Sequence, residues 1–152
     1  MSFNPIHATR ARITDAWTPV QLDLLDALVA ACALVAQADG WVTPDERGRM
    51  LERMRGLAAL TVFGIDDALE VFEALDQRFE QDAETARLEA ELAIRRLRGR
   101  DDVARVVVNS ACAVATADGG LDAEERDVLL RICALLSLDP IQFDLITTAG
   151  RR

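Results

Sequence analysis

The chain has 152 residues, a length typical of one domain with a substantial hydrophobic core. Hydrophobic residues make up 51% of it and charged residues 28%, a composition that excludes a disordered chain and a membrane-spanning one. Its 26 acidic and 17 basic residues give a net charge of −9, which argues against binding to nucleic acid or to anionic lipid. We therefore expect no nucleic-acid partner and no membrane insertion.

Side chains that commonly serve in catalysis are scarce. The chain has one histidine, His7, no tyrosine and no lysine, so Schiff-base and histidine-assisted nucleophilic catalysis lack their usual groups. The cysteines lie in apolar helical patterns without CxxC spacing, which is typical of buried free thiols in a reducing cytoplasm: Cys32, Cys112 and Cys133. Residues 1–16 contain no apolar stretch typical of a signal peptide. We expect a cytoplasmic protein that is not an enzyme.

Helical periodicity runs through the chain, and no segment alternates apolar and polar residues as a strand would. Capping boxes, in which a Thr or Asp is followed three residues later by Glu or Gln, mark helix starts at Thr18, Thr43, Asp122 and Asp139. The predicted helices lie, in chain order, at about 19–38, 44–60, 65 onward, 81–98, 101–117, 123–137 and, as a short last helix, from 140. The predicted fold class is all-α, a compact bundle of about seven helices.

An internal repeat includes two of these helix starts. A shift of 79 residues aligns residues 35–47 with 114–126, and seven of the thirteen pairs are identical. An alanine-rich, almost wholly apolar helix precedes each copy, at 27–38 and 103–117. A helix that is apolar all round is buried all round, and small side chains let two helices approach closely. We therefore expect these helices to form the centre of the bundle around a pseudo-twofold axis, with almost complete burial of Ala33, Leu34, Val107 and Val114.

Two copies of the repeat are too few for a solenoid, which favours a compact bundle. The predicted organisation is a single domain over residues 1–152. Residues 1–17 form an N-terminal extension in this prediction, and the two repeats are centred on residues 18–60 and 101–150.

The repeated turn has the pattern ADG-x-[VL]-[TD]-x-[DE]-E, at residues 38–46 (the first ADG turn) and 117–125 (the second ADG turn). An EF-hand is disfavoured, because its first ligand position would be Val35 or Val114. A purely structural interpretation explains most of the pattern by helix capping. In it, the N-caps are Thr43 and Asp122, their partners are Glu46 and Glu125, and the preceding helices end at Gly40 and Gly119.

A third interpretation is a cation site. Capping explains Asp39 and Asp118 poorly, because a carboxylate at the C-terminal end of a helix faces the negative end of the helix dipole. With no histidine or thiolate nearby, the acids would bind a hard cation such as calcium, magnesium or manganese. The candidate metal ligands are Asp39, Glu46, Asp118 and Glu125, with Asp45, Asp122 and Glu124 as additional candidates. The two turns share one end of the bundle only if the central helices are parallel, which the sequence leaves open.

An apolar helix of small residues, ADG, a hydrophobic residue and then a capped helix with a glutamate, twice in one chain, resembles the TerB family. This family includes the tellurite-resistance protein TerB and the N-terminal domain of DjlA-type co-chaperones, and the resemblance extends from about Thr18 to the last helix. It implies an all-α fold of two similar halves in a cytoplasmic bacterial protein of tellurite or other stress resistance. It also implies that acids of the two turns bind metal or protein partners, here Asp39, Glu46, Asp118 and Glu125. The repeat aligns Trp41 with Gly120, so the two turns differ at this position and need not be equivalent.

The resulting hypothesis is a non-enzymatic stress-resistance protein that binds metal or protein partners through its two ADG turns. One alternative is a hydrolase that uses a divalent metal held by the same carboxylates. Another is a domain that associates with itself through an exposed apolar face on the third or fourth helix, as a homo-oligomer.

Two groups of arginines also need an explanation. We expect the first group to be solvated and paired with acids of its own helix: Arg47, Arg49, Arg53 and Arg55. The second is the densest positive cluster of an acidic chain and a candidate face for docking a partner: Arg95, Arg96, Arg98 and Arg100.

Overall fold

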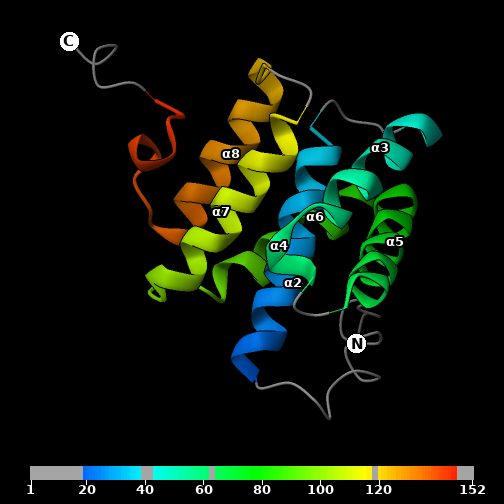
Figure 1. The fold of residues 1–152 in the computed structure, drawn as a ribbon, viewed down its shortest axis with the longest axis horizontal. Coiled ribbons are helices and arrows are strands. Elements are labelled where there is room, and N and C mark those ends of the chain that lie inside the picture. The colour runs from blue at the N-terminus through cyan, green and yellow to red at the C-terminus, as the bar shows by residue number, and fades with distance from the viewer. Residues whose placement is uncertain (1–18, 39–42, 62–63, 118–119, 147–152) are drawn as a thin grey trace.

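The computed structural model describes residues 19–38, 43–61, 64–117 and 120–146. Within them the chain forms α-helices and one 3-10 helix and contains no strand (Figure 1). In chain order these are α2 (Pro19–Ala36), α3 (Pro44–Arg55), α4 (Ala58–Thr61), α5 (Ile65–Gln81), α6 (Ala83–Arg95), α7 (Asp101–Ala115), α8 (Ala123–Leu136) and the 3-10 helix η2 (Pro140–Phe143). The predicted all-α class is confirmed. The described helices include none long and apolar enough to cross a membrane.

α2 is the central helix of the bundle. It packs against α3, α5, α6, α7 and α8, and every residue from 27 to 35 is at most 7% exposed. The prediction that the apolar helix 27–38 is buried all round is confirmed for residues 27–35, whereas residues 36–38 are half-buried. Its alanines allow the surrounding helices to approach closely, because a methyl group occupies little of the space between two helix axes.

α7, the second helix predicted to be buried all round, has an exposed face. Val107 and Val114 are buried as predicted, but Arg105, Asn109 and Ala113 are exposed at successive turns. The prediction of all-round burial for residues 103–117 is therefore wrong. The reason is that α5 and α6 cover α2 on the sides that α7 leaves open, whereas α7 packs against α2, α3, α8 and η2 and keeps one side toward solvent.

The two repeats are arranged with pseudo-twofold symmetry. α2 and α7 pack on each other and run in the same direction, from the lower to the upper side of Figure 1. Each of them packs against both α3 and α8, the helices that follow the two ADG turns. Equivalent backbone bonds end the central helices: the Gln37 amide donates to Ala33 (3.0 Å) and the Thr116 amide to Cys112 (2.9 Å).

Several predicted helix ends differ from the observed ones. The predicted helix 44–60 is interrupted after Arg55, where the amides of Gly56 and Leu57 donate to carbonyls three residues earlier, Arg53 and Met54, at 3.1 Å each. Glycine favours this interruption because it loses more conformational freedom in a helix than other residues. The predicted helix 101–117 ends at Ala115, and the short last helix from 140 is a 3-10 helix.

The predicted helix 81–98 is also shorter, because Asp82 separates α5 from α6. Its carboxylate accepts hydrogen bonds from the Thr85 amide (3.2 Å) and the Thr85 hydroxyl (2.7 Å), so it caps α6. The helix itself ends at Arg95, and turns lead from there to Gly99, whose φ is 89°. The capping start of the first helix at Thr18 lies outside the described residues.

The central position of α2 predicts a strong penalty for added volume. Ala33 is 2% exposed, so Ala33→Leu should lower the free energy of unfolding by about 1–3 kcal/mol through overpacking. Ala113→Leu, on the exposed face of α7, should change it by less than about 0.5 kcal/mol. Urea unfolding measures both, and equal effects of the two substitutions would contradict the tight packing of α2.

Candidate functional site

The described parts of the two ADG turns, residues 38 and 43–46 of the first and 117 and 120–125 of the second, lie at the same end of the bundle. Since α2 and α7 are parallel, the turn that follows each of them leaves from the upper side of the molecule in Figure 1. Close to them is an open hollow of about 570 Å³, lined by Ala117 at the start of the second turn and by residues at the beginning of α3, including Pro44 and Asp45 of the first. The structure thus settles the question of direction that the sequence left open.

The candidate metal ligands are described only in part. Asp39 and Asp118 lie outside the described residues, and so does the side chain of Glu46. Of the others, Asp45, Asp122 and Glu124 are exposed and Glu125 is half-buried. Among the residues whose side chains are described, no three His, Cys, Asp or Glu are placed to hold a metal ion together. The described carboxylates therefore do not make a cation site alone, and such a site would need Asp39 and Asp118.

In the second ADG turn the predicted capping box is present. The Asp122 carboxylate accepts a hydrogen bond from the Glu125 amide at 2.7 Å, and the Glu125 carboxylate accepts one from the Asp122 amide at 3.3 Å. The Arg126 amide adds a bond to the Asp122 carbonyl at 3.0 Å. These three contacts are all local and cap the start of α8.

The first ADG turn is held from outside, by a buried carboxylate of α5. The side chain of Asp76 is 6% exposed and lies 3.0 Å from the Nε atom of Arg47. The side-chain amide of Gln37 donates a hydrogen bond of 3.2 Å to the same carboxylate. Gln37 precedes the turn and Arg47 follows it, so Asp76 connects both sides of the turn to α5. Arg47 also contacts Glu80 at 3.1 Å.

The sequence pattern did not predict this network. It assigned Arg47 to a solvated group with Arg49, Arg53 and Arg55, and for Arg47 that assignment is wrong, because its partners lie on another helix. A signal was nevertheless present. Asp76 occupies the apolar face of α5, together with Phe72, Leu75 and Phe79, and a carboxylate on a buried face needs a partner.

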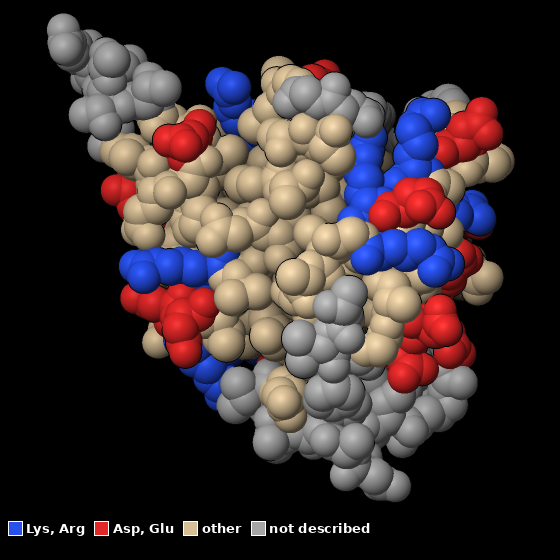
Figure 2. All heavy atoms as spheres, in the orientation of Figure 1, with Lys and Arg blue, Asp and Glu red and all other residues tan. Residues whose placement is uncertain are grey.

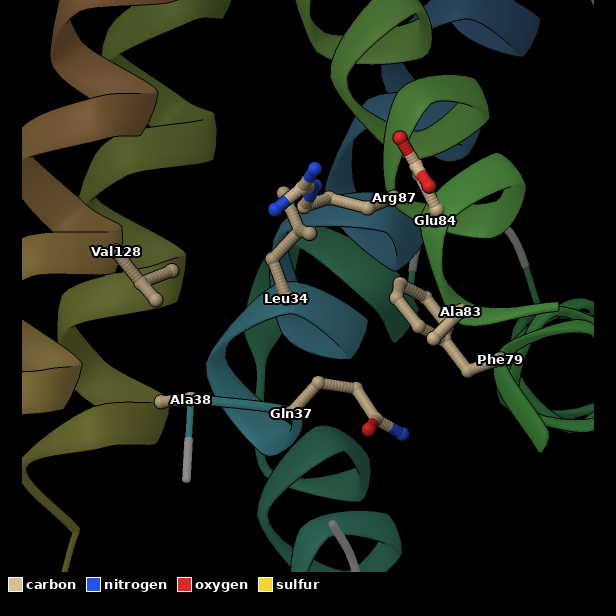
Figure 3. A pocket seen from close by; sticks show the side chains of 8 residues that line it. All are labelled: Leu34, Gln37, Ala38, Phe79, Ala83, Glu84, Arg87 and Val128. Atoms are coloured by element: carbon tan, nitrogen blue, oxygen red, sulfur yellow. The ribbon is translucent and has the colours of Figure 1, made fainter. Parts of the chain in front are cut away.

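A second hollow, of about 620 Å³, lies beside the first ADG turn (Figure 3). Figure 3 shows Val128 of α8 on one side and Phe79 of α5 on the other, with Leu34 of α2 between them. Ala38 lines this hollow together with Val128, and the repeat maps this pair onto Ala117 and Arg49, which line the first hollow. The repeat thus relates one pair of lining positions in the two hollows, and charged side chains line both of them, Glu84 and Arg87 in the second hollow and Asp45 and Arg49 among those in the first.

The three cysteines are protonated thiols at neutral pH. Burial raises the pKa of Cys32 to about 12, and burial together with Cys112 and Asp139 raises that of Cys133 to about 11. Burial also raises the pKa of Cys112. Since a thiolate is the form that attacks carbon or binds metal, none of these side chains is prepared for either role.

Three of the four arginines of the second group contact side chains elsewhere in the same chain. Arg96 lies 3.7 Å from the buried Asp26 of α2, and Arg100 lies 3.8 Å from Asp23 of the same helix. The Arg98 guanidinium donates a hydrogen bond of 2.8 Å to the hydroxyl of Ser137. These arginines hold the α6–α7 connection against α2 and α8, a role that the sequence did not predict. On the face in Figure 2, acidic and basic side chains lie beside each other along the edges, so the net negative charge is not gathered there.

The network at the first turn predicts a pH effect. Burial raises the pKa of Asp76 above its ordinary value of 3.8, and Arg47 offsets part of that rise. The folded state then holds this proton more tightly than the unfolded state, so Asp76 makes folding less favourable as the pH rises from 3.8 through its raised pKa. Asp76→Asn removes the ionisation. The free energy of unfolding of this variant, relative to that of the parent, should increase as the pH rises from 4 to 7. A difference between the two that stays constant with pH would contradict the prediction.

The second turn predicts a local effect. Asp122→Ala removes the acceptor of the Glu125 amide and should lower the free energy of unfolding by about 1 kcal/mol. Glu125→Gln should have a smaller effect, since an amide oxygen can accept from the Asp122 amide as a carboxylate does. Urea unfolding of both variants tests this order, and the reverse order would contradict the capping box.

Comparison with known proteins gives the chain its family. The family model described as "Tellurite resistance protein TerB" matches residues 25–148. Searches of curated proteins and of solved structures gave no significant match. The match covers both repeats and the α5–α6 pair between them, and it agrees with the resemblance carried by the two ADG turns. The chain belongs to the TerB family of tellurite-resistance proteins.

Proposed function

We propose that this TerB-family protein is a non-enzymatic interaction module of tellurite or related stress resistance. Its working surface is the end of the bundle that carries the two ADG turns. The observation that carries this proposal is the parallel packing of α2 and α7, which brings both copies of the acidic motif to one end. Antiparallel helices would have separated the two copies by the length of the bundle.

The acids of this end suit a hard cation. Asp39, Glu46, Asp118 and Glu125 would supply carboxylate oxygens for calcium, magnesium or manganese, with Asp45, Asp122 and Glu124 nearby in sequence. Capping uses one oxygen each of Asp122 and Glu125. The cation would add positive charge where the chain places several carboxylates. A bound cation would in this way change the surface that a protein partner meets.

The proposed protein does not catalyse hydrolysis, and its proposed location is a reducing compartment. We do not extend the proposal to hydrolysis, because the two hollows at this end are lined by carboxylates, guanidiniums, one amide and apolar groups, with neither His nor Lys among the described lining residues. The free thiols of Cys32, Cys112 and Cys133 support a reducing compartment such as the bacterial cytoplasm.

Thermal unfolding with and without cations tests the proposal. A cation at about a hundredfold over its Kd adds about 2.7 kcal/mol to the free energy of unfolding. For a chain of this length, that corresponds to a rise in Tm of about 5–10 °C. We expect this rise in the parent with calcium, magnesium or manganese, and its loss in the double variant Asp39→Asn, Asp118→Asn. The double variant Glu46→Gln, Glu125→Gln should lose it too while keeping its stability in chelator.

The matched control removes the same number of charges at the other end of α7. Asp101 and Asp102 are exposed in its first turn, so the double variant Asp101→Asn, Asp102→Asn should keep the cation-dependent rise in Tm. A parent whose Tm does not move with any of the three cations would contradict the cation site. If the control also loses the rise in Tm, the stabilisation by the cation depends on the net charge of the protein and not on the carboxylates of the turns.

A further inference from the structure

α6 carries an apolar stripe that the bundle does not cover. Leu88 is 53% exposed and Leu92 is 54% exposed, and they are the large hydrophobic side chains that stand out as exposed among the described residues. They lie one helical turn apart, opposite the face that α6 buries with Ala86, Ala90 and Ile94. Their exposure therefore follows from the helix geometry and not from a frayed end.

The carboxylates beside this stripe are already neutralised by neighbouring helices. Glu89 forms an ion pair with Arg78 of α5 at 2.6 Å, and Glu91 forms one with Arg131 of α8 at 3.0 Å. Each pair ties α6 to the helix on one side of it. The two pairs neutralise these two carboxylates, and the exposed Arg87 adds one positive charge beside Leu88.

The ends of the stripe carry opposite charges. Glu84 lies one turn before Leu88, and Arg95 lies one turn after Leu92, so the four side chains share one face of α6. Glu84 and Arg95 are both exposed, and neither forms an ion pair with any other described residue. The exposed face of α6 thus carries, from its N-terminal end, Glu84, then Arg87 at its edge, the two leucines, and Arg95.

We propose that this face binds a second copy of the chain, with the two α6 helices antiparallel. In that arrangement Leu88 packs on Leu92 of the partner subunit, and Leu92 packs on Leu88 of the partner subunit. Glu84 then meets Arg95 of the partner subunit, and the same contact forms again across the twofold axis. The face is complementary to itself in charge and in apolar pattern, which is why a second copy fits it.

Only the antiparallel direction satisfies the charges. A parallel pair would place Glu84 beside its own copy and Arg95 beside its own copy, and like charges in an interface are costly. The apolar area is small, so the interface belongs at the low end of specific interfaces, below about 1,200 Å². The dimer is therefore reversible and depends on protein concentration. Its contacts include no residue of the ADG turns, and Glu84 is the dimer residue that also lines the hollow beside the first turn. Failure of the dimer would leave the proposed cation site unaffected.

Charge exchange at the two ends of the stripe tests the dimer. Sedimentation equilibrium of the full chain, from micromolar to near-millimolar concentration, should show the parent passing from one chain to two. Glu84→Arg alone and Arg95→Glu alone each create two repulsive contacts and should weaken the Kd by at least about tenfold. The double variant Glu84→Arg, Arg95→Glu should restore the parent Kd. A mixture of the two single variants should form a heterodimer.

Two controls isolate the surface. Arg105→Glu makes the same charge change as Arg95→Glu at an exposed position of α7 and should leave the Kd unchanged. Leu88→Ser with Leu92→Ser should abolish the dimer while the helical circular dichroism is retained, because both side chains are already exposed. A parent that stays monomeric throughout, or a double charge variant that stays as weak as the single ones, would overturn the proposal.

Discussion

The close, parallel contact between α2 and α7 is the constraint on which the rest of the structure depends. α2 can occupy the centre of the bundle because alanine and other small residues keep its surface narrow from residue 27 to 35. Its parallel direction relative to α7 then determines where the chain leaves each helix. The described parts of both copies of the acidic motif therefore lie at the same end, and this shared location makes that end the strongest candidate for a binding surface.

The helices between the two repeats break the symmetry of that end. α5 and α6 pack on α2, and α5 supplies the buried Asp76 that binds Gln37 and Arg47 on the two sides of the first ADG turn. The second turn relies on the local capping box of Asp122 and Glu125. The first turn is therefore coupled to the protonation of a tertiary partner, Asp76. The two copies of the motif are therefore held by different described contacts, a buried carboxylate of α5 at the first and a capping box at the second.

Several arginines of the chain form contacts between helices. Arg78 and Arg131 fix α6 between α5 and α8, and Arg96 reaches the buried Asp26 of α2. Such partly buried pairs contribute to which helices meet, and a surface pair contributes little. Once these pairs are formed, the charged side chains of α6 without a described ion-pair partner are Glu84 and Arg95, at the ends of its leucine stripe, and Arg87 beside the stripe.

The sequence by itself determined the all-α class, the repeat, most helix starts and the capping box of the second turn, because these depend on residues within a few positions of one another. It also led to the family, since the two ADG turns are local patterns. Tertiary structure alone decided the direction of α2 relative to α7, the open face of α7 and the partners of Arg47. Each of these depends on residues that are distant in the chain, as Gln37 and Asp76 are, and a helical pattern shows that a face is apolar without showing which neighbour covers it.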